Sequence, residues 1–183
     1  VFFDDVRVPK ANRIGKENDG WSVAKYLLEF ERFSISSIEL RRLINRTRRL
    51  ANETVTTGNS LSSDPAFLKK LAQLEINALA METSEQRVLA NLSAGNRPGS
   101  VSSVLNAISA ETLQKADELA IEVAAYYGLP CQPAALEVGG PSAIGSAMTL
   151  PIMPSYMNNR MRTIAGGSAE VQRNIVAKSI LEL

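Results

Sequence analysis

The stretch "KYLLEFERFSISS", Lys25 to Ser37, decides how the first long helical segment of this chain is interpreted. Around it, apolar residues recur every three or four positions, which is the spacing of one face of an α-helix. Glu31 falls near the middle of that face. The pattern therefore predicts a carboxylate on the side of the helix that should face the core. The apolar residues of this arc are Trp21, Ala24, Leu27, Leu28, Ile35 and Ile38.

Composition excludes several classes of protein. The 183 residues are 45% hydrophobic, which is enough for one globular domain with a sizeable core. The 20 basic residues nearly balance 19 acidic ones, so no excess of positive charge indicates binding to nucleic acid. No apolar run approaches the length of a membrane span. The basic run "RRLINRTRRLA", Arg41 to Ala51, is interpreted as the solvated face of a long helix.

Cysteine and histidine usage narrows the chemistry further. Histidine is absent, so Ser-His-Asp or Cys-His catalytic sites and His-ligated zinc cannot be built from this chain alone. Acid–base chemistry must then use Asp, Glu, Lys or Tyr. Cys131 is the only cysteine, which excludes an internal disulfide and fits a reducing compartment. We therefore expect a cytoplasmic protein.

Helical segments follow a short β-rich start. The chain opens with "VFFDDV" and without a methionine, so we expect residues 1–20 to be the tail of a preceding β-domain with its linker, in a longer protein. Three antiparallel helices and a broken fourth predict an all-α four-helix bundle over residues 21–183. Residues 129–147 are rich in Pro, Gly and Ala and are expected to be irregular. The helices are expected over residues 21–57, 65–94, 100–128 and 150–183, the last broken at 165–168.

The residues alone leave three interpretations of Glu31 open. It can form a buried ion pair with Arg32, Arg160 or Arg162, because a buried charge needs a partner. The helix can also extend past its neighbours, so that the carboxylate reaches water. Alternatively, a carboxylate held among apolar side chains takes up a proton more readily, which suits a general base. The spacing does not choose among these.

A second candidate site is the stretch "RTIAGGSAEVQRNIVAKSIL", Arg162 to Leu181. Its adjacent glycines would let a ligand approach the backbone closely, and Ser168 is a good helix N-cap. The N-terminus of the helix that follows offers free N–H groups to an anion or oxyanion. A turn followed by a capped helix explains the same pattern without a ligand.

Two stretches resemble the acyl-CoA dehydrogenase family. Val1 to Arg32 is similar to the junction between the β-domain and the C-terminal helical domain of these enzymes, and "TIAGGSAEVQRNIVAKSIL", Thr163 to Leu181, is similar to their closing signature. The middle resembles mainly the large-subunit type exemplified by pimeloyl-CoA dehydrogenase. The resemblance implies FAD, an acyl-CoA substrate that is converted to trans-2-enoyl-CoA, and a place in fatty acid metabolism. It also implies electron-transferring flavoprotein as the acceptor and an oligomeric enzyme.

The resemblance also implies roles for individual residues. The family places its base either just before the closing Gly-Thr/Ser motif or on the first helix of this domain, before an arginine. Gly166 stands at the first position and cannot act, whereas Glu31 stands at the second, before Arg32. Glu31 is therefore the expected base, and the missing side chain at Gly166 leaves room for a bulky or branched acyl group. Matching positions imply substrate contacts from Glu29, Phe30, Arg32, Gly166 and Gly167, and FAD contacts from Ser168, Ala169 and Glu170.

Two features of the family are altered here. The arginine that precedes Phe-Gly on the second helix is not found, and the flavin-gripping Gln and Gly-Gly correspond to Glu122, Ala125 and Tyr126. In the family these residues reach the FAD of a neighbouring subunit, where the charge of Glu122 would repel a pyrophosphate. We therefore expect a heteromer with a related subunit, with a homo-oligomer as the alternative.

Three functions stay open at this point. The expected one is a catalytic acyl-CoA dehydrogenase domain that does not turn over by itself. A non-catalytic helical interaction domain would keep the same fold for assembly. A flavoenzyme of this fold that oxidises a nitroalkane or another non-thioester substrate is the third.

Overall fold

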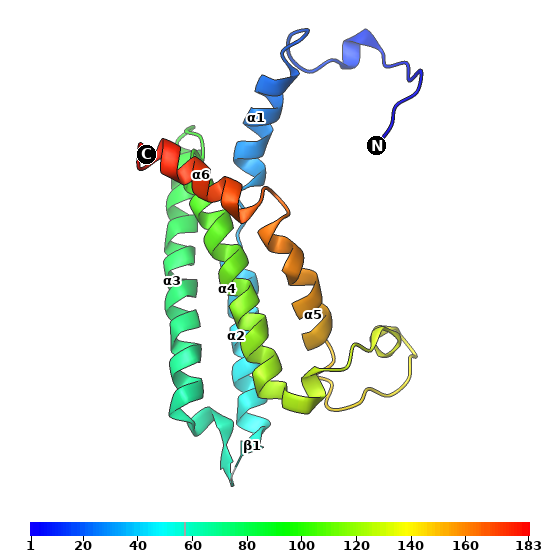
Figure 1. Cartoon of the computed structure of the whole chain (residues 1–183), viewed down its shortest axis with the longest axis vertical. Coiled ribbons are helices and arrows are strands. Elements are labelled where there is room, and N and C mark those ends of the chain that lie inside the picture. The colour runs from blue at the N-terminus through cyan, green and yellow to red at the C-terminus, as the bar shows by residue number, and fades with distance from the viewer. Residues whose placement is uncertain (57) are drawn as a thin grey trace.

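The computed structural model describes residues 1–56 and 58–183. Three long helices, α2 (Ser37–Glu53), α3 (Pro65–Ser93) and α4 (Val101–Ala124), run along the long axis of the molecule, and the shorter α5 (Ile152–Asn159) lies beside them (Figure 1). This arrangement confirms the all-α four-helix bundle. Two further helices, α1 (Gly20–Glu31) and α6 (Ala169–Ser179), lie at one end of it.

The core lies where α2, α3 and α4 meet. Leu40 of α2 and Leu113 of α4 are fully buried, and Leu71 of α3 is nearly so. The apolar spacing of three and four in each helix brings these side chains to the shared interface. Asp64 caps α3, its Oδ1 accepting a hydrogen bond from the N–H of Ala66 at 2.8 Å. The fold therefore rests on ordinary amphipathic packing of three long helices.

The single helix expected over residues 21–57 is wrong. The chain forms α1, turns at residues 32–36, and then forms α2, which ends at Glu53; Thr57 itself lies outside the described residues. The break has a side-chain cause. Glu85 of α3 is buried, and its Oε1 accepts the N–H groups of Ser36 and Ser37 at 2.8 and 3.0 Å. A carboxylate that holds these free N–H groups favours a new helix start.

Helix α1 does not bury the apolar arc that the sequence predicts. It has no buried residue, and Trp21 and Leu27 are 69% and 64% exposed. Figure 1 shows α1 standing beyond the end of the bundle, where the turn after Glu31 separates it from α2. The arc on α1 therefore faces no core among the described residues.

Most other boundaries agree with the sequence. Strands β1 (Val55–Thr56) and β2 (Asn59–Ser60) form a small antiparallel hairpin after α2. Residues 129–147 are irregular apart from one 3-10 turn at Pro133–Leu136, and the last helical region is broken before α6. The strand expected from the β-rich start is wrong, because residues 1–19 contain only a 3-10 turn at Lys10–Asn12, and Gly20 begins α1. A strand needs a partner strand, and the part of the chain that the structure describes forms its one sheet from β1 and β2 alone. Within the described residues, no helix is long and apolar enough to cross a membrane.

Candidate functional site

Glu31 is the last residue of α1, and its side chain is exposed. The interpretation in which the carboxylate reaches water is therefore correct for this structure. The buried ion pair is wrong: Arg160 pairs with Glu118 at 3.1 Å and Arg162 with Glu39, and no described cation is paired with Glu31. A carboxylate that ends an exposed helix is free to meet a ligand. Its role as base stays a prediction.

The neighbours of Glu31 are held by a residue that sequence reasoning missed. Arg97, between α3 and α4, lies 3.8 Å from the carboxylate of Glu29 and stacks over the ring of Tyr26 at 4.9 Å from its centroid. Phe30 packs on the same ring, with centroids 5.0 Å apart. Glu29 and Phe30, both predicted to contact substrate, therefore form an anchor for α1 in this structure.

The predicted substrate and flavin residues of the second stretch form a tight turn before α6. Gly166 and Gly167 have φ values of +71° and +100°, a backbone region that favours glycine. The fully buried Gln172 donates its Nε2–H to the carbonyls of Gly166 and Gly167 at 3.0 and 3.2 Å. A Cβ on Gly167 would lie 2.3 Å from that nitrogen. Both glycines are thus required by the turn itself, whether or not a ligand approaches.

The first turn of α6 has the features of an anion-binding helix start. Ser168 Oγ accepts the N–H of Val171 at 3.4 Å, whereas the N–H of Ala169 has no acceptor among the described residues. The N–H of Glu170 bonds its own carboxyl group and, with the hydroxyl of Ser168, holds the pKa of that carboxyl below its ordinary value. A free N–H at the positive end of a helix suits an oxyanion or a polar oxygen of a cofactor.

A chain of hydrogen bonds connects this turn to the start of α2. Asp117 of α4 is buried and accepts from Asn159 Nδ2 at 2.6 Å, and Asn159 Oδ1 accepts from Arg162 Nε at 2.6 Å. Arg162 then binds both carboxylate oxygens of Glu39, at 2.8 and 2.6 Å. Both of these bonds come from the single Nη2 of Arg162, and charge-assisted hydrogen bonds of this kind are stronger than those between neutral groups. The network sets where the turn lies relative to α2.

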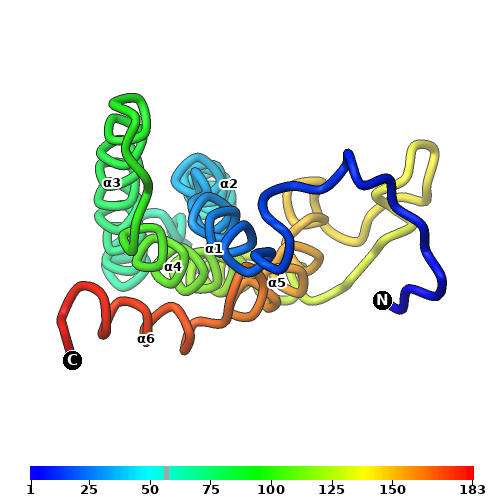
Figure 2. The backbone as a smooth tube through the Cα atoms, turned by 90° about the horizontal axis from the view of Figure 1, so that it is seen from above, coloured from blue at the N-terminus to red at the C-terminus, as the bar shows by residue number. Residues whose placement is uncertain are grey.

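The structure thus brings the two predicted stretches to one end of the bundle. Figures 1 and 2 show α1 ending at the same end as the turn that precedes α6. Arg162 of the second stretch contacts Glu39 of α2, which lies two residues beyond the first stretch. Two buried acids of this framework carried a sequence signal. Glu85 follows Met81 by four positions and precedes Val88 by three, and Asp117 follows Leu113 by four, so both lie on apolar faces.

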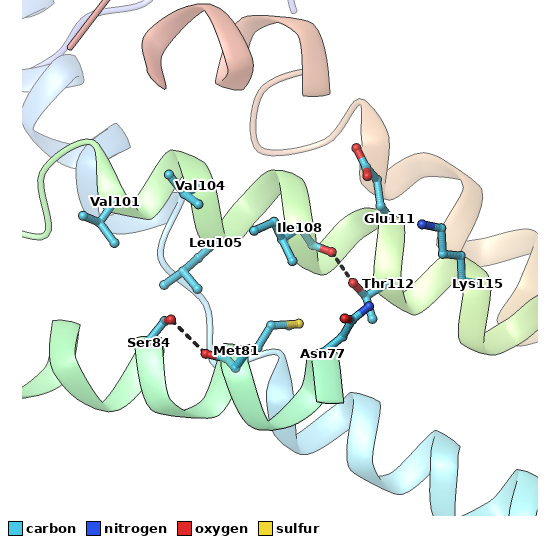
Figure 3. Close-up of a pocket in the computed structure, with 11 residues that line it drawn as sticks. Asn77, Met81, Ser84, Val101, Val104, Leu105, Ile108, Glu111, Thr112 and Lys115 are labelled. Carbon is cyan, nitrogen blue, oxygen red and sulfur yellow. Dashed lines mark hydrogen bonds between the residues drawn. The ribbon is translucent and has the colours of Figure 1, made fainter. Parts of the chain in front are cut away.

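A separate hollow of about 300 Å³ lies between α3 and α4. Figure 3 shows Met81, Leu105 and Ile108 around it, with Glu111 and Lys115 at one side. None of the predicted site residues lines this hollow. No cluster of His, Cys, Asp and Glu in the described residues has the geometry to hold a metal ion.

Comparison with known proteins identifies the family. Residues 18–181 match the family model described as "Acyl-CoA dehydrogenase, C-terminal domain". The chain belongs to the acyl-CoA dehydrogenase family.

Relatives and solved structures agree with this assignment. The acyl-CoA dehydrogenase IpdE1 of Mycolicibacterium smegmatis is 28% identical over 183 residues, covering 100% of this chain and 42% of that protein. An acyl-CoA dehydrogenase of Geobacillus kaustophilus matches with a TM-score of 0.82 at 20% identity, over 100% of this chain and 44% of that one. Butyryl-CoA dehydrogenase of Megasphaera elsdenii matches with a TM-score of 0.81 at 16% identity, over 98% and 43%. The chain therefore spans less than half the length of the relatives that it matches.

The positions at which the sequence of this acyl-CoA dehydrogenase domain is predicted to depart from its family lie at and just after the end of α4. Ala125, which the sequence predicts to stand in place of a family glycine, has a φ of +48°, so its backbone has a conformation typical of glycine. Glu122, predicted to stand in place of the flavin-gripping glutamine, binds Lys70 of α3 with both oxygens, at 2.6 and 2.7 Å. Lys70 offsets the charge that would repel a pyrophosphate, which weakens that argument for a heteromer. Tyr126 is 77% exposed.

Proposed function

We propose that this chain is the C-terminal helical domain of an FAD-dependent acyl-CoA dehydrogenase in which Glu31 takes the α-proton of an acyl-CoA thioester. The product is the trans-2-enoyl-CoA. The observation that carries the proposal is a contrast between the two positions at which the family places its base. Gly166 has no side chain and is fixed in a turn, whereas Glu31 is an exposed carboxylate at the C-terminal end of α1.

The other residues bind and orient. Glu29, Phe30 and Arg32 flank the base, and Gly166 and Gly167 would line the thioester end. Arg32 is half-buried, and its Nε has no hydrogen-bond partner among the described residues, so it keeps a donor for a ligand. The proposal of a bulky or branched acyl group comes from the missing side chain at Gly166; Asn106 lies close to this position, because a Cβ there would meet its Nδ2 at 3.3 Å.

The start of α6 fits a flavin. Ser168, Ala169 and Glu170 would hold it, through the free N–H of Ala169 and the positive end of the helix. FAD, when bound, accepts the β-hydrogen as hydride. Glu170 is negatively charged and follows Ala169 directly. Its charge disfavours an anion at the N–H of Ala169 and favours an uncharged polar oxygen of the cofactor. The residues present are therefore compatible with the cofactor.

The domain boundaries and partners are part of the same proposal. Residues 1–20 belong to the tail of a preceding β-domain and residues 21–183 to the helical domain; every residue of the first segment is exposed, as expected of a segment whose partners lie elsewhere. Because the relatives are more than twice as long, this chain alone does not turn over. We propose electron-transferring flavoprotein as acceptor, a heteromer with a related subunit or a homo-oligomer, and a cytoplasmic location supported by the lone exposed Cys131.

The test is flavin reduction by the full-length protein, purified alone and with its closest co-expressed homologue. Acyl-CoA substrates of increasing bulk should bleach the flavin band, and nitroalkanes should not. Bleaching that requires the homologue supports the heteromer. A protein that binds no FAD and bleaches under neither condition would show instead a helical interaction domain that has kept the fold without catalysis.

A further inference from the structure

The basic run of α2 divides into two faces in the structure. Arg41 pairs with Glu82, its Nε lying 3.0 Å from the carboxylate, and Arg48 pairs with Glu75. Both acids belong to α3. This half of the run is therefore neutralised where α2 and α3 meet.

The other face carries Arg42, Arg46 and Arg49 and turns toward α5. The spacing of four and three residues places the three guanidinium groups on one side of the helix. They line a hollow of about 320 Å³ together with Glu39, Leu43 and Ser155. Figure 1 shows α5, which carries Ser155, lying beside α2. Three cations thus converge on one concave surface.

The acids around this hollow are already engaged. Glu39 is held by both bonds from Arg162. Asp117 accepts from Ser155 Oγ at 2.7 Å and from Asn159 at 2.6 Å. No carboxylate of the described residues forms an ion pair with any arginine of this face. The neutral donors leave the charge of Asp117 in place, and that charge acts on Arg46, so the three arginines give the hollow an excess of positive charge that is only partly offset.

Arg46 is the central member of the set. Its Nε is buried and has no hydrogen-bond partner among the described residues. Burial lowers the pKa of Arg46 from its ordinary value, and the charge of Asp117 partly restores it. A buried donor without an acceptor is costly, and like charges three and four residues apart on a helix repel. Both costs are removed if an anion occupies the hollow.

We propose that this hollow binds a phosphate-bearing anion, a phosphate monoester or a diphosphate, through Arg42, Arg46 and Arg49. Planar guanidinium forks match the oxygens of a phosphate group, and one such group brings more negative charge into a small volume than a single carboxylate does. The proposal is independent of the dehydrogenation proposed above, because none of the three arginines belongs to the Glu31 and Gly166 site.

The test is calorimetric titration of the full-length protein with inorganic pyrophosphate and, separately, with inorganic phosphate. Arg46→Gln should weaken binding by about tenfold or more, because it removes a charged donor from the centre of the site. The matched control is Arg48→Gln, on the same helix but paired with Glu75, and it should change affinity by less than about twofold. Flavin content and acyl-CoA bleaching should stay unchanged in Arg46→Gln, which shows that the variant is folded.

The relative affinity for pyrophosphate and phosphate distinguishes a diphosphate ligand from a phosphate monoester. Preference for pyrophosphate indicates a diphosphate such as that of a nucleotide cofactor, and equal binding indicates a phosphate monoester. Absence of binding to the wild type would overturn the proposal and indicate that acidic side chains of another domain or subunit cover the hollow. An equal loss in Arg46→Gln and Arg48→Gln would overturn it too, because binding would then follow net charge alone.

Discussion

The start of α2 depends on one buried carboxylate, and this dependence can be measured. Glu85 accepts the N–H groups of Ser36 and Ser37 with one oxygen and the hydroxyl of Ser37 with the other. Glu85→Gln keeps an oxygen for the two N–H groups and loses the charge, which we expect to cost about 1–2 kcal/mol. Glu85→Ala leaves three donors without an acceptor, at about 1–1.5 kcal/mol each, or roughly 4 kcal/mol in total.

The assay is hydrogen exchange in the first turn of α2, followed by mass spectrometry on the full-length protein. Each 1.4 kcal/mol lost from the local opening free energy raises the exchange rate about tenfold. Exchange should therefore accelerate by about tenfold in Glu85→Gln and by about 1,000-fold in Glu85→Ala. The control is Glu82→Gln. Glu82 lies on α3 like Glu85, but it forms only an exposed ion pair with Arg41 of α2, so its loss should change the exchange rate by less than about threefold. Equal rates in wild type and Glu85→Ala would refute the reasoning that this carboxylate starts the helix.

Three further outcomes follow from the backbone and from one titrating group. Ala125→Gly should raise the free energy of unfolding in urea by about 0.5–1 kcal/mol. Glycine removes the strain of the positive φ, and this gain exceeds the stability lost because the unfolded chain becomes more flexible. The Cβ of Ala125 is exposed, so its loss removes little buried surface. Gly167→Ala should destabilise it by about 2 kcal/mol or more and lower Tm, because the new Cβ meets the Gln172 side chain at a φ of +100°. The lowered pKa of Glu170 means that its ionised form supports α6 at neutral pH, and that this support is lost as the pH falls below 4.5 through the folded-state pKa. In wild type, protection from hydrogen exchange in the first turn of α6 should therefore fall below pH 4.5, and in Glu170→Gln this fall should be absent.

Local patterns were enough to predict the bundle. The apolar spacing of Phe67, Leu71 and Leu74 and the Asp64–Pro65 start predict α3 closely, since burial and capping act on the same segment. The closing motif predicts the break before α6 because two adjacent glycines at positive φ end a helix. Each of these features depends on residues that are close together in the sequence.

Long-range polar contacts were not predictable in the same way. The break after Glu31 depends on Glu85, 48 or more positions further along the chain, which no local window contains. The same holds for the pair of Arg162 and Glu39, separated by 123 positions. The arc on α1 misled the interpretation because an amphipathic helix predicts that a partner exists, not that the partner belongs to the same bundle.

The central claim is that Glu31 removes the α-proton. The most direct measurement is the rate of anaerobic flavin reduction by an acyl-CoA in full-length Glu31→Gln, with Glu53→Gln, exposed at the far end of α2, as control. We expect Glu31→Gln to keep its FAD and to lose at least about 100-fold in rate, with the control unchanged. A Glu31→Gln protein that binds FAD and reduces it at the wild-type rate would contradict the account and place the base elsewhere.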